Sequence, residues 1–172
     1  MSNQQSATEI ADLFKLGMRK LAAGVSLITS GSGENRVGLI ATAVNSVSAD
    51  PPTLLICVNQ NASAHDAIAA NQAFCVNILP ANCIEIAGQF SSSARRAERF
   101  TNGEWETLKT GSPVLEEALV AFDCEVIHQM AYHTHTIFFG KIVDVKLGED
   151  EVEPLIYLDR TFHLGASERI AV

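Results

Sequence analysis

Four short apolar segments rich in β-branched residues limit this chain to a small set of folds. Between residues 25 and 79 they read VSLITS, RVGLIATAV, TLLICVN and AFCVNIL, and clusters of Gly, Asn, Pro or Ser separate them. Segments of this length and composition, bounded by turn-forming residues, are typical of β-strands. The break at residues 31–35, GSGEN, predicts a hairpin loop between the first two strands.

Helical segments are fewer and short. Before the first strand, apolar residues recur at steps of three and four, as on one face of a helix. They are Ile10, Leu13, Phe14, Met18 and Leu21. Ser6 and Glu9 have the spacing of a capping box at the start of that helix. Further short helices are predicted at residues 63–72 and 82–90, and a third, SARRAERF, ends at Phe100.

The second half of the chain adds more strands. Residues 119–128 and 136–147 are long apolar runs, and from Val143 to Leu147 apolar and charged residues alternate, as in a strand with one solvent-exposed face. Two short pieces, PLIYLD and TFHLG, follow. Strands outnumber helices and do not alternate with them, which disfavours a doubly wound parallel sheet. We expect a mainly β, closed antiparallel barrel with inserted helices, in one domain over 1–172, with residues 1–24 leading into the barrel.

Composition and charge exclude several classes of protein. A chain of 172 residues, 47% of them apolar, can bury a core without disulfides or a structural metal. Its net charge of −8 and lack of a basic tract argue against nucleic acid or an anionic membrane as a partner. Apolar runs such as Leu54 to Val58 are far shorter than the ~20 residues of a membrane-spanning helix, and no signal sequence opens the chain. We expect a cytoplasmic protein that holds any anion through local donors.

The sequence does not favour a metal or a common catalytic motif. The four cysteines include no C-x-x-C pair, and Cys57 and Cys75 lie in strand-like runs, where a thiol usually packs as a small hydrophobe. His133 and His135 are spaced to share one face of a strand, but no third ligand has a recognisable spacing. No phosphate loop, nucleophile elbow or H-E-x-x-H helix is present. We expect no metal site.

Two polar clusters, at residues 42–48 and 59–63, follow predicted strands. Small side chains such as Ala43 let a flat ligand approach the backbone, while hydroxyl and amide groups donate to an anion or a ring carbonyl. Asn59, Asn61 and Ser63 precede a predicted helix, whose N-terminus favours an anion. Ordinary turns and caps have the same composition, so composition alone does not decide between a binding site and simple turns.

The order of the motifs is more specific than any one of them. The chain reads ATAVNSVSADPPTLLICVNQNASAHDAI, then FCVNIL, PVLEEALVAFDCEV, HTHTIFFGKIV and PLIYLDRTFH, and the pattern extends from about Leu13 to Gly165. This arrangement resembles the short-chain flavin reductases. These are the reductase components of two-component aromatic hydroxylases that share a diffusible flavin, such as the 4-hydroxyphenylacetate and chlorophenol monooxygenase systems of aromatic catabolism.

The resemblance implies an FMN-binding split β-barrel, usually a homodimer, that reduces free FAD or FMN with NADH and releases it to a separate oxygenase. A non-catalytic flavin carrier of the same fold is the alternative. A third possibility is an oxidase of the pyridoxamine-phosphate type. It would need a basic phosphate pocket, whereas Lys and Arg are sparse in sequence around the two polar clusters.

The resemblance also implies which residues bind. The ring-binding residues are Thr42, Ala43, Val44, Asn45 and Ser46, and Ser48 supports their loop. The ribityl and phosphate end of the flavin would contact Asn59 and Ser63. The distal part of the flavin would contact Phe90, Ser91 and the 95–100 stretch, which includes Phe100. The closing segment contains Tyr157, Arg160 and Phe162. His135 would orient the nicotinamide, with no obligatory catalytic acid, although His133 and Thr134 precede it where relatives commonly have a glycine.

Overall fold

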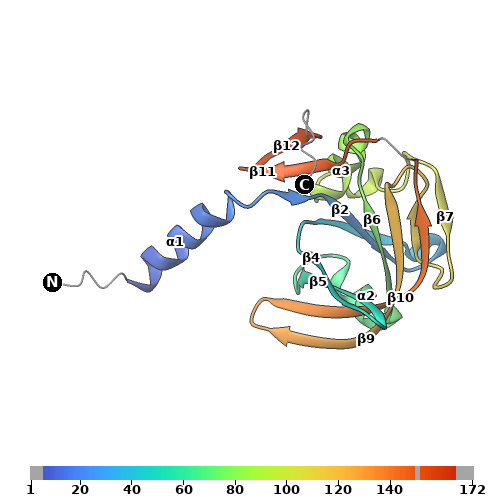
Figure 1. The fold of residues 1–172 in the computed structure, drawn as a ribbon, viewed down its shortest axis with the longest axis horizontal. Helices are drawn as coiled ribbons and strands as arrows, with labels where there is room; N and C mark the ends of the chain where they lie inside the picture. Colours follow the sequence, from blue (N-terminus) through green and yellow to red (C-terminus); the bar gives the residue numbers. More distant parts are fainter. Residues whose placement is uncertain (1–5, 150–151, 166–172) are drawn as a thin grey trace.

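The computed structural model describes residues 6–149 and 152–165. Figure 1 shows a curled β body from which one N-terminal helix projects. The helices are α1 (Ala7–Met18), α2 (His65–Asn71) and α3 (Ile84–Ser91), with 3-10 turns η1 (Gly33–Asn35), η2 (Ala81–Cys83) and η3 (Arg96–Glu98). The strands are β1 (Ala23–Gly24), β2 (Ser26–Ser30), β3 (Val37–Ala41), β4 (Val44–Ala49), β5 (Pro52–Asn59), β6 (Ala73–Ile78), β7 (Trp105–Thr107), β8 (Pro113–Leu115), β9 (Val120–Tyr132), β10 (His135–Leu147), β11 (Leu155–Leu158) and β12 (Thr161–Leu164).

The main sheet is antiparallel throughout, as predicted. Its seven strands follow the order β3-β2-β6-β9-β10-β5-β4, and the expected loop at residues 31–35 joins β2 to β3. β1, β11 and β12 form a second sheet, and β7 pairs with β8. The closed barrel is not confirmed, because no ladder in the described part of the chain joins the two edge strands, β3 and β4. The sheet curls, and its edges stay open.

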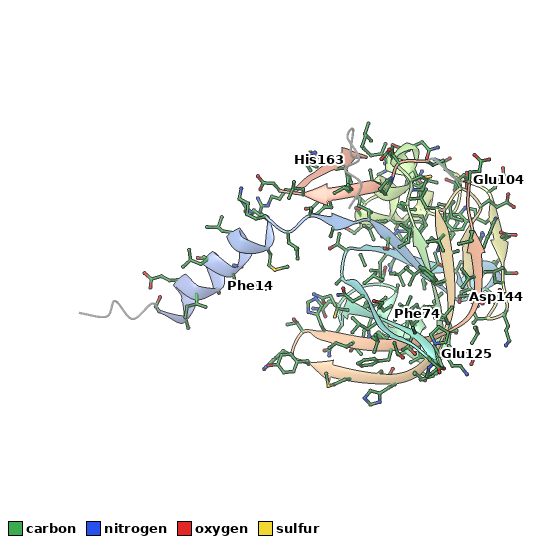
Figure 2. The ribbon with its side chains drawn as sticks, viewed as in Figure 1. Phe14, Phe74, Glu104, Glu125, Asp144 and His163 are labelled. Atoms are coloured by element: carbon green, nitrogen blue, oxygen red, sulfur yellow. The ribbon has the colours of Figure 1, made fainter. Side chains whose placement is uncertain are left out.

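Strand β2 separates two hydrophobic cores. All five of its residues are buried, and successive side chains of a strand point to opposite faces. Ile28 packs with Phe74 and Phe138 in the first core, inside the curled sheet, whereas Leu27 belongs to the second core with Phe90, under α3. Figure 2 labels Phe74 within the β body. The two cores hold α2 and α3 against opposite faces of β2, and the loops that flank both helices form part of the site described below.

Helix α1 forms as predicted but lies away from the body. The capping box is present: Glu9 N–H donates to Ser6 Oγ, and the Ser6 amide donates to the Glu9 carboxylate. The helix ends at Met18, before Leu21, and buries no residue. Phe14, labelled on the projecting helix in Figure 2, is 65% exposed. The apolar stripe therefore has no partner within the described chain.

Two local predictions are wrong in detail. The stretch SARRAERF forms only the 3-10 turn η3, which ends before Arg99. In β10 the charged residue, Lys146, is half-buried and pairs with Glu106, while Leu147 is exposed, because the register shifts at a bulge between Ile142 and Asp144. A bulge exchanges the two faces of a strand, so alternation no longer tells which face is buried.

The other predicted strands match β5, β6 and β9 to β12 within a few residues. The sequence did not predict β4, β7 or β8; β4 is a largely exposed edge strand, so its residues form no apolar run. β9 and β10 form the long hairpin expected from the runs at 119–128 and 136–147, and β11 and β12 form a closing hairpin. Within residues 6–149 and 152–165, no helix is long and apolar enough to cross a membrane.

Candidate functional site

A large cavity of about 920 Å³ opens where several strands of the main sheet end. Its lining residues are Leu39, Ile40, Ala41, Thr42, Ala43, Cys57, Asn59, Asn61, Ala62, Ser63, Phe90, Ser91, Ser93, Arg96, Arg99, His135, Tyr157 and Phe162. Its lining residues come from β3, β5, β10, the segment after α3 and the β11–β12 hairpin. Residues that are far apart in the sequence therefore meet in one place.

Many of the predicted site residues line this cavity. They are Thr42, Ala43, Asn59, Ser63, Phe90, Ser91, His135, Tyr157 and Phe162. Others do not line it: Val44, Asn45, Ser46 and Ser48 lie on the edge strand β4, and Phe100 lines a neighbouring cavity. Arg160 lies in the turn between β11 and β12. The cavity thus combines the ends of the two predicted polar clusters with the later segments that the resemblance implied.

One wall of the cavity consists of small residues and backbone. The Cys57 amide donates to the Ala43 carbonyl at 3.1 Å, which extends the β4–β5 ladder to the cavity. In an antiparallel ladder, hydrogen-bonded and non-hydrogen-bonded residues alternate, so the next N–H, that of Val44, points to the open edge of the sheet. Cys57, which was predicted to pack as a core hydrophobe, is only half-buried and lines the cavity, whereas Cys75 is buried as predicted. Cys83 and Cys124 are buried thiols as well.

Some polar atoms of the predicted clusters serve as ordinary turns. Asn59 Oδ1 accepts the Asn61 amide at 2.8 Å, and Ser48 Oγ accepts the Asp50 amide at 3.1 Å. These side-chain oxygens stabilise the local backbone. For these two atoms the simpler interpretation of the clusters is correct.

The cavity also carries two arginines, which belong to the 95–100 stretch that the resemblance assigned to the distal part of the flavin. Arg99 Nη1 donates to Ser63 Oγ at 3.2 Å and to the Gly38 carbonyl at 3.1 Å, and Nη2 donates to the Phe90 carbonyl at 3.2 Å. Arg96 is exposed beside it and lines the same cavity. No local sequence signal predicts the contact between Arg99 and Ser63, because the two residues are 36 positions apart.

These arginines change the electrostatics expected from the sequence. Within the described residues, neither Arg96 nor Arg99 forms an ion pair, whereas the nearby Arg95 pairs with Glu85 and Glu98. Burial, followed by the charge of Arg96, lowers the pKa of Arg99 from its ordinary value. Arginine nevertheless stays protonated in proteins. Lys and Arg are therefore sparse around the two polar clusters in sequence but not in space.

His135 also lines the cavity, in direct cross-strand register with Asn59. Its Nδ1 lies 2.8 Å from Thr134 Oγ1, and the Thr134 carbonyl accepts the Gln60 amide at 2.9 Å. His133 occupies the hairpin turn with φ of 50°, a conformation that favours glycine. His133 therefore lies in the turn between β9 and β10 and does not share a strand face with His135.

The floor of the cavity is aromatic. Phe90 is buried, with its ring centroid 5.0 Å from that of Phe100, which in turn lies 4.8 Å from Trp105. The Gly38 backbone approaches Phe90 so closely that an added Cβ would lie 2.6 Å from the ring. Glycine at position 38 thus lets Phe90 reach the cavity floor. In the described part of the chain, no group of three or more His, Cys, Asp or Glu side chains is placed to hold a metal ion.

Comparison with known proteins identifies the family. Residues 18–166 match the model of the flavin reductase like domain. The chain belongs to the flavin reductase-like family. It is 39% identical over 162 residues to the FMN reductase (NADH) RutF of Stutzerimonas stutzeri, which covers 94% of this chain and 92% of that relative. The family resemblance drawn from the motifs is confirmed at this level.

Solved structures of the family share the fold. A crystal structure of a proposed flavin reductase from Haemophilus somnus superposes with a TM-score of 0.83 at 40% identity, covering 88% of this chain and 97% of the other. BorF, the flavin reductase component of a bacterial two-component tryptophan halogenase, gives a TM-score of 0.81 at 26% identity, covering 91% and 99%. The arrangement of strands around the cavity is therefore common to flavin reductases.

Proposed function

We propose that this chain is an NADH:flavin oxidoreductase that reduces free FAD or FMN and supplies the reduced flavin to a separate monooxygenase. The observation that carries the proposal is the lining of the large cavity. Small residues, backbone and His135 line it together with the guanidinium groups of Arg96 and Arg99. Family membership and the NADH-dependent FMN reductase that it resembles agree with this activity.

The residues present fit a flavin. Small side chains at Thr42 and Ala43 leave room for a flat ring beside the backbone. The side chain of Arg96, which makes no hydrogen bond or ion pair within the described residues, offers donors to a phosphate near the charge of Arg99. Guanidinium groups match phosphate geometry better than neutral hydroxyls do. The open edges of the curled sheet also support the split β-barrel implied by the motifs.

When bound, the flavin supplies a ring that accepts a hydride from NADH. The protein's part is then to position the two rings and to stabilise negative charge. In this proposal such charge is met by backbone N–H groups at the open edge of β4, those of Val44 and Ser46, whereas the Asn45 N–H faces β5. Tyr157 and Phe162, whose ring centroids lie 5.6 Å apart, line the cavity from the closing hairpin.

His135 orients the nicotinamide in this proposal and is not an obligatory acid. We expect His135→Ala to raise the KM for NADH about tenfold while the rate of hydride transfer at saturating NADH falls far less. His133→Ala, in the adjoining turn, is the matched control and should leave both parameters near wild type. An unchanged KM together with a lost hydride-transfer rate would show that His135 has a chemical role instead.

Turnover separates the reductase from the flavin carrier that the sequence left open. The purified protein is mixed with NADH and an excess of FAD or FMN, and the loss of NADH absorbance is followed, with NADPH in parallel. We expect multiple turnovers with at least one flavin. Flavin binding without turnover for either flavin would establish a carrier and refute the reductase.

We also propose that the partner oxygenase hydroxylates an aromatic substrate. The motif resemblance to aromatic hydroxylase reductases supports this, and the resemblance to BorF supports a two-component arrangement. The test places the reductase and a purified 4-hydroxyphenylacetate monooxygenase component in chambers separated by a dialysis membrane that passes flavin. Hydroxylated product across the membrane is expected. Product formation only when the two proteins mix would refute coupling through diffusible flavin.

We also propose that two copies of the chain form a homodimer through helix α1. The apolar stripe of α1 is exposed, with Ile10 at 54% and Phe14 at 65%, and a second copy would bury it. Light scattering after size exclusion is expected to give twice the mass of one chain. Phe14→Glu should shift the mass toward the monomer, while Lys15→Glu on the same helix should not. A wild-type monomer with full activity would refute the dimer.

A further inference from the structure

A histidine behind the large cavity, His65, lies between two of the segments that line it. It is the first residue of α2, and its side chain is only 15% exposed. The imidazole ring packs on Phe138, a fully buried residue of the first core, with the two ring centroids 5.6 Å apart. A polar ring in this position needs hydrogen-bond partners within the protein, because burial removes those that water would supply.

Both nitrogen atoms of the His65 ring have a partner. Nδ1 lies 2.9 Å from Asp66 Oδ1, and Nε2 lies 2.9 Å from Thr136 Oγ1. An ionised carboxylate only accepts hydrogen bonds, so in the neutral ring Nδ1 carries the proton and Nε2 accepts from the Thr136 hydroxyl. Thr136 is 5% exposed, and among the described residues its hydroxyl has no other hydrogen-bond partner. The bond between His65 and Thr136 is therefore directed and lies inside the protein.

This bond closes the loop at residues 59–65, which joins β5 to α2. At the start of the loop, Asn59 pairs with His135 across the β5–β10 ladder. At its far end, His65 bonds Thr136, the next residue of β10. The loop is thus attached to the start of β10 at both of its ends. Its residues that line the large cavity are Asn59, Asn61, Ala62 and Ser63.

The start of β10 has little other support. Residues 128–135, at the end of the β9–β10 hairpin, are all exposed, and Thr136 is the first buried residue of β10. Successive side chains of a strand point to opposite faces, so His135 lines the cavity while Thr136 points into the first core, where His65 meets it. A segment with few buried contacts depends on its hydrogen bonds for a fixed position. The bond at Thr136 therefore restrains the backbone that carries His135.

We propose that His65 is a positioning residue for hydride transfer, which acts through its hydrogen bond to Thr136 and fixes His135 relative to the loop at residues 59–65. The inference rests on the proposed function and deepens it, because a reaction without an obligatory acid depends on the placement of its groups. The same loop carries Ser63, whose Oγ accepts from Arg99 at 3.2 Å. His65 thus links the part of the site that holds the flavin to the residue that orients the nicotinamide.

The test measures the apparent KM for NADH in Thr136→Val and, separately, in His65→Phe. Valine removes the hydroxyl and keeps the branched shape, and phenylalanine removes the ring nitrogens and keeps a ring against Phe138. Each substitution is expected to raise the KM about fivefold, less than the change of about tenfold expected for His135→Ala, while the limiting rate of hydride transfer falls far less. Thr136→Ser restores the hydroxyl and should return the KM to within about twofold of wild type.

Thr53→Val is the matched control for the loss of a buried hydroxyl. Thr53 is 6% exposed on β5, donates from Oγ1 to the Pro51 carbonyl at 3.0 Å, and lines none of the cavities described. Its substitution should lower stability in urea unfolding, as Thr136→Val does, but leave the KM for NADH near wild type. An equal rise of the KM in both variants would show a general loss of stability and overturn the proposal.

Combination with His135→Ala decides whether the bond acts through His135. In that background Thr136→Val is expected to raise the KM no further, because the effects of residues that act through one another do not add. A further rise of about fivefold, or a wild-type KM in Thr136→Val alone, would overturn the proposal. His65→Phe gives the same comparison if Thr136→Val does not fold. A wild-type protein that oxidises no NADH with either flavin would refute the proposed function itself, and the role of His65 with it.

Discussion

Arg99 is predicted to support both the fold and the binding of flavin, and the structure allows the two roles to be separated. Its guanidinium makes three hydrogen bonds of 3.2 Å or less, to the Gly38 carbonyl, Ser63 Oγ and the Phe90 carbonyl. The Phe90 carbonyl belongs to the last turn of α3, where carbonyl groups lack partners within the helix. Arg99 therefore ties β3 and the loop before α2 to the end of α3.

The size of the effect follows from these bonds. Each hydrogen bond contributes about 1 kcal/mol net, and Arg99 is only half-buried, so water recovers part of the loss. We expect Arg99→Ala to lower the free energy of unfolding by about 2–3 kcal/mol, which corresponds to a fall in Tm of about 4–12 °C for a chain of this size. Arg99→Lys keeps the charge but cannot reach all three acceptors, and should lie between Ala and wild type.

Arg96→Ala is the matched control. Arg96 lines the same cavity, but its side chain makes no hydrogen bond or ion pair within the described residues. It should weaken FMN binding about tenfold, as Arg99→Ala does, while changing stability by less than about 0.5 kcal/mol. Urea unfolding and FMN titration are measured on all three variants. An Arg99→Ala protein as stable as wild type, or an equal loss of stability in Arg96→Ala, would refute the reasoning.

Two further predictions concern buried positions. Burial raises the pKa of Asp123, opposed by hydrogen bonds from Thr110, so the folded state holds the proton more tightly than the unfolded state. The carboxyl of Asp123 therefore destabilises the fold increasingly as pH rises from its ordinary pKa through the raised value. In thermal unfolding, the stability of Asp123→Asn relative to wild type should increase between about pH 4 and pH 7. A difference that stays constant over this range would contradict the prediction. Gly38→Ala should displace Phe90 and lower stability by about 1–3 kcal/mol together with FMN affinity, whereas Gly17→Ala, whose added Cβ meets nothing within 4 Å, should do neither. Unchanged stability and affinity in Gly38→Ala would show that the cavity floor tolerates the shift.

Local sequence signals predicted most of the secondary structure. β-Branched runs and turn residues located the strands, and the Ser6–Glu9 spacing located the start of α1. These features depend on neighbours within a few residues, so the sequence contains them directly. The predictions failed where a distant contact decided the outcome, as at Lys146, which is half-buried beside Glu106 from another strand.

The sequence by itself determined the strand-rich class, the hairpins and, through the order of its motifs, the flavin reductase family. Tertiary structure alone decided which groups face the ligand. It placed Val44 to Ser48 on an open sheet edge and brought Arg96 and Arg99 to the loop that holds Ser63. The physical reason is that such contacts form when the two cores pack against β2, and the free energy of that packing depends on the whole chain. An acidic sequence can thus carry a basic cavity that its composition conceals.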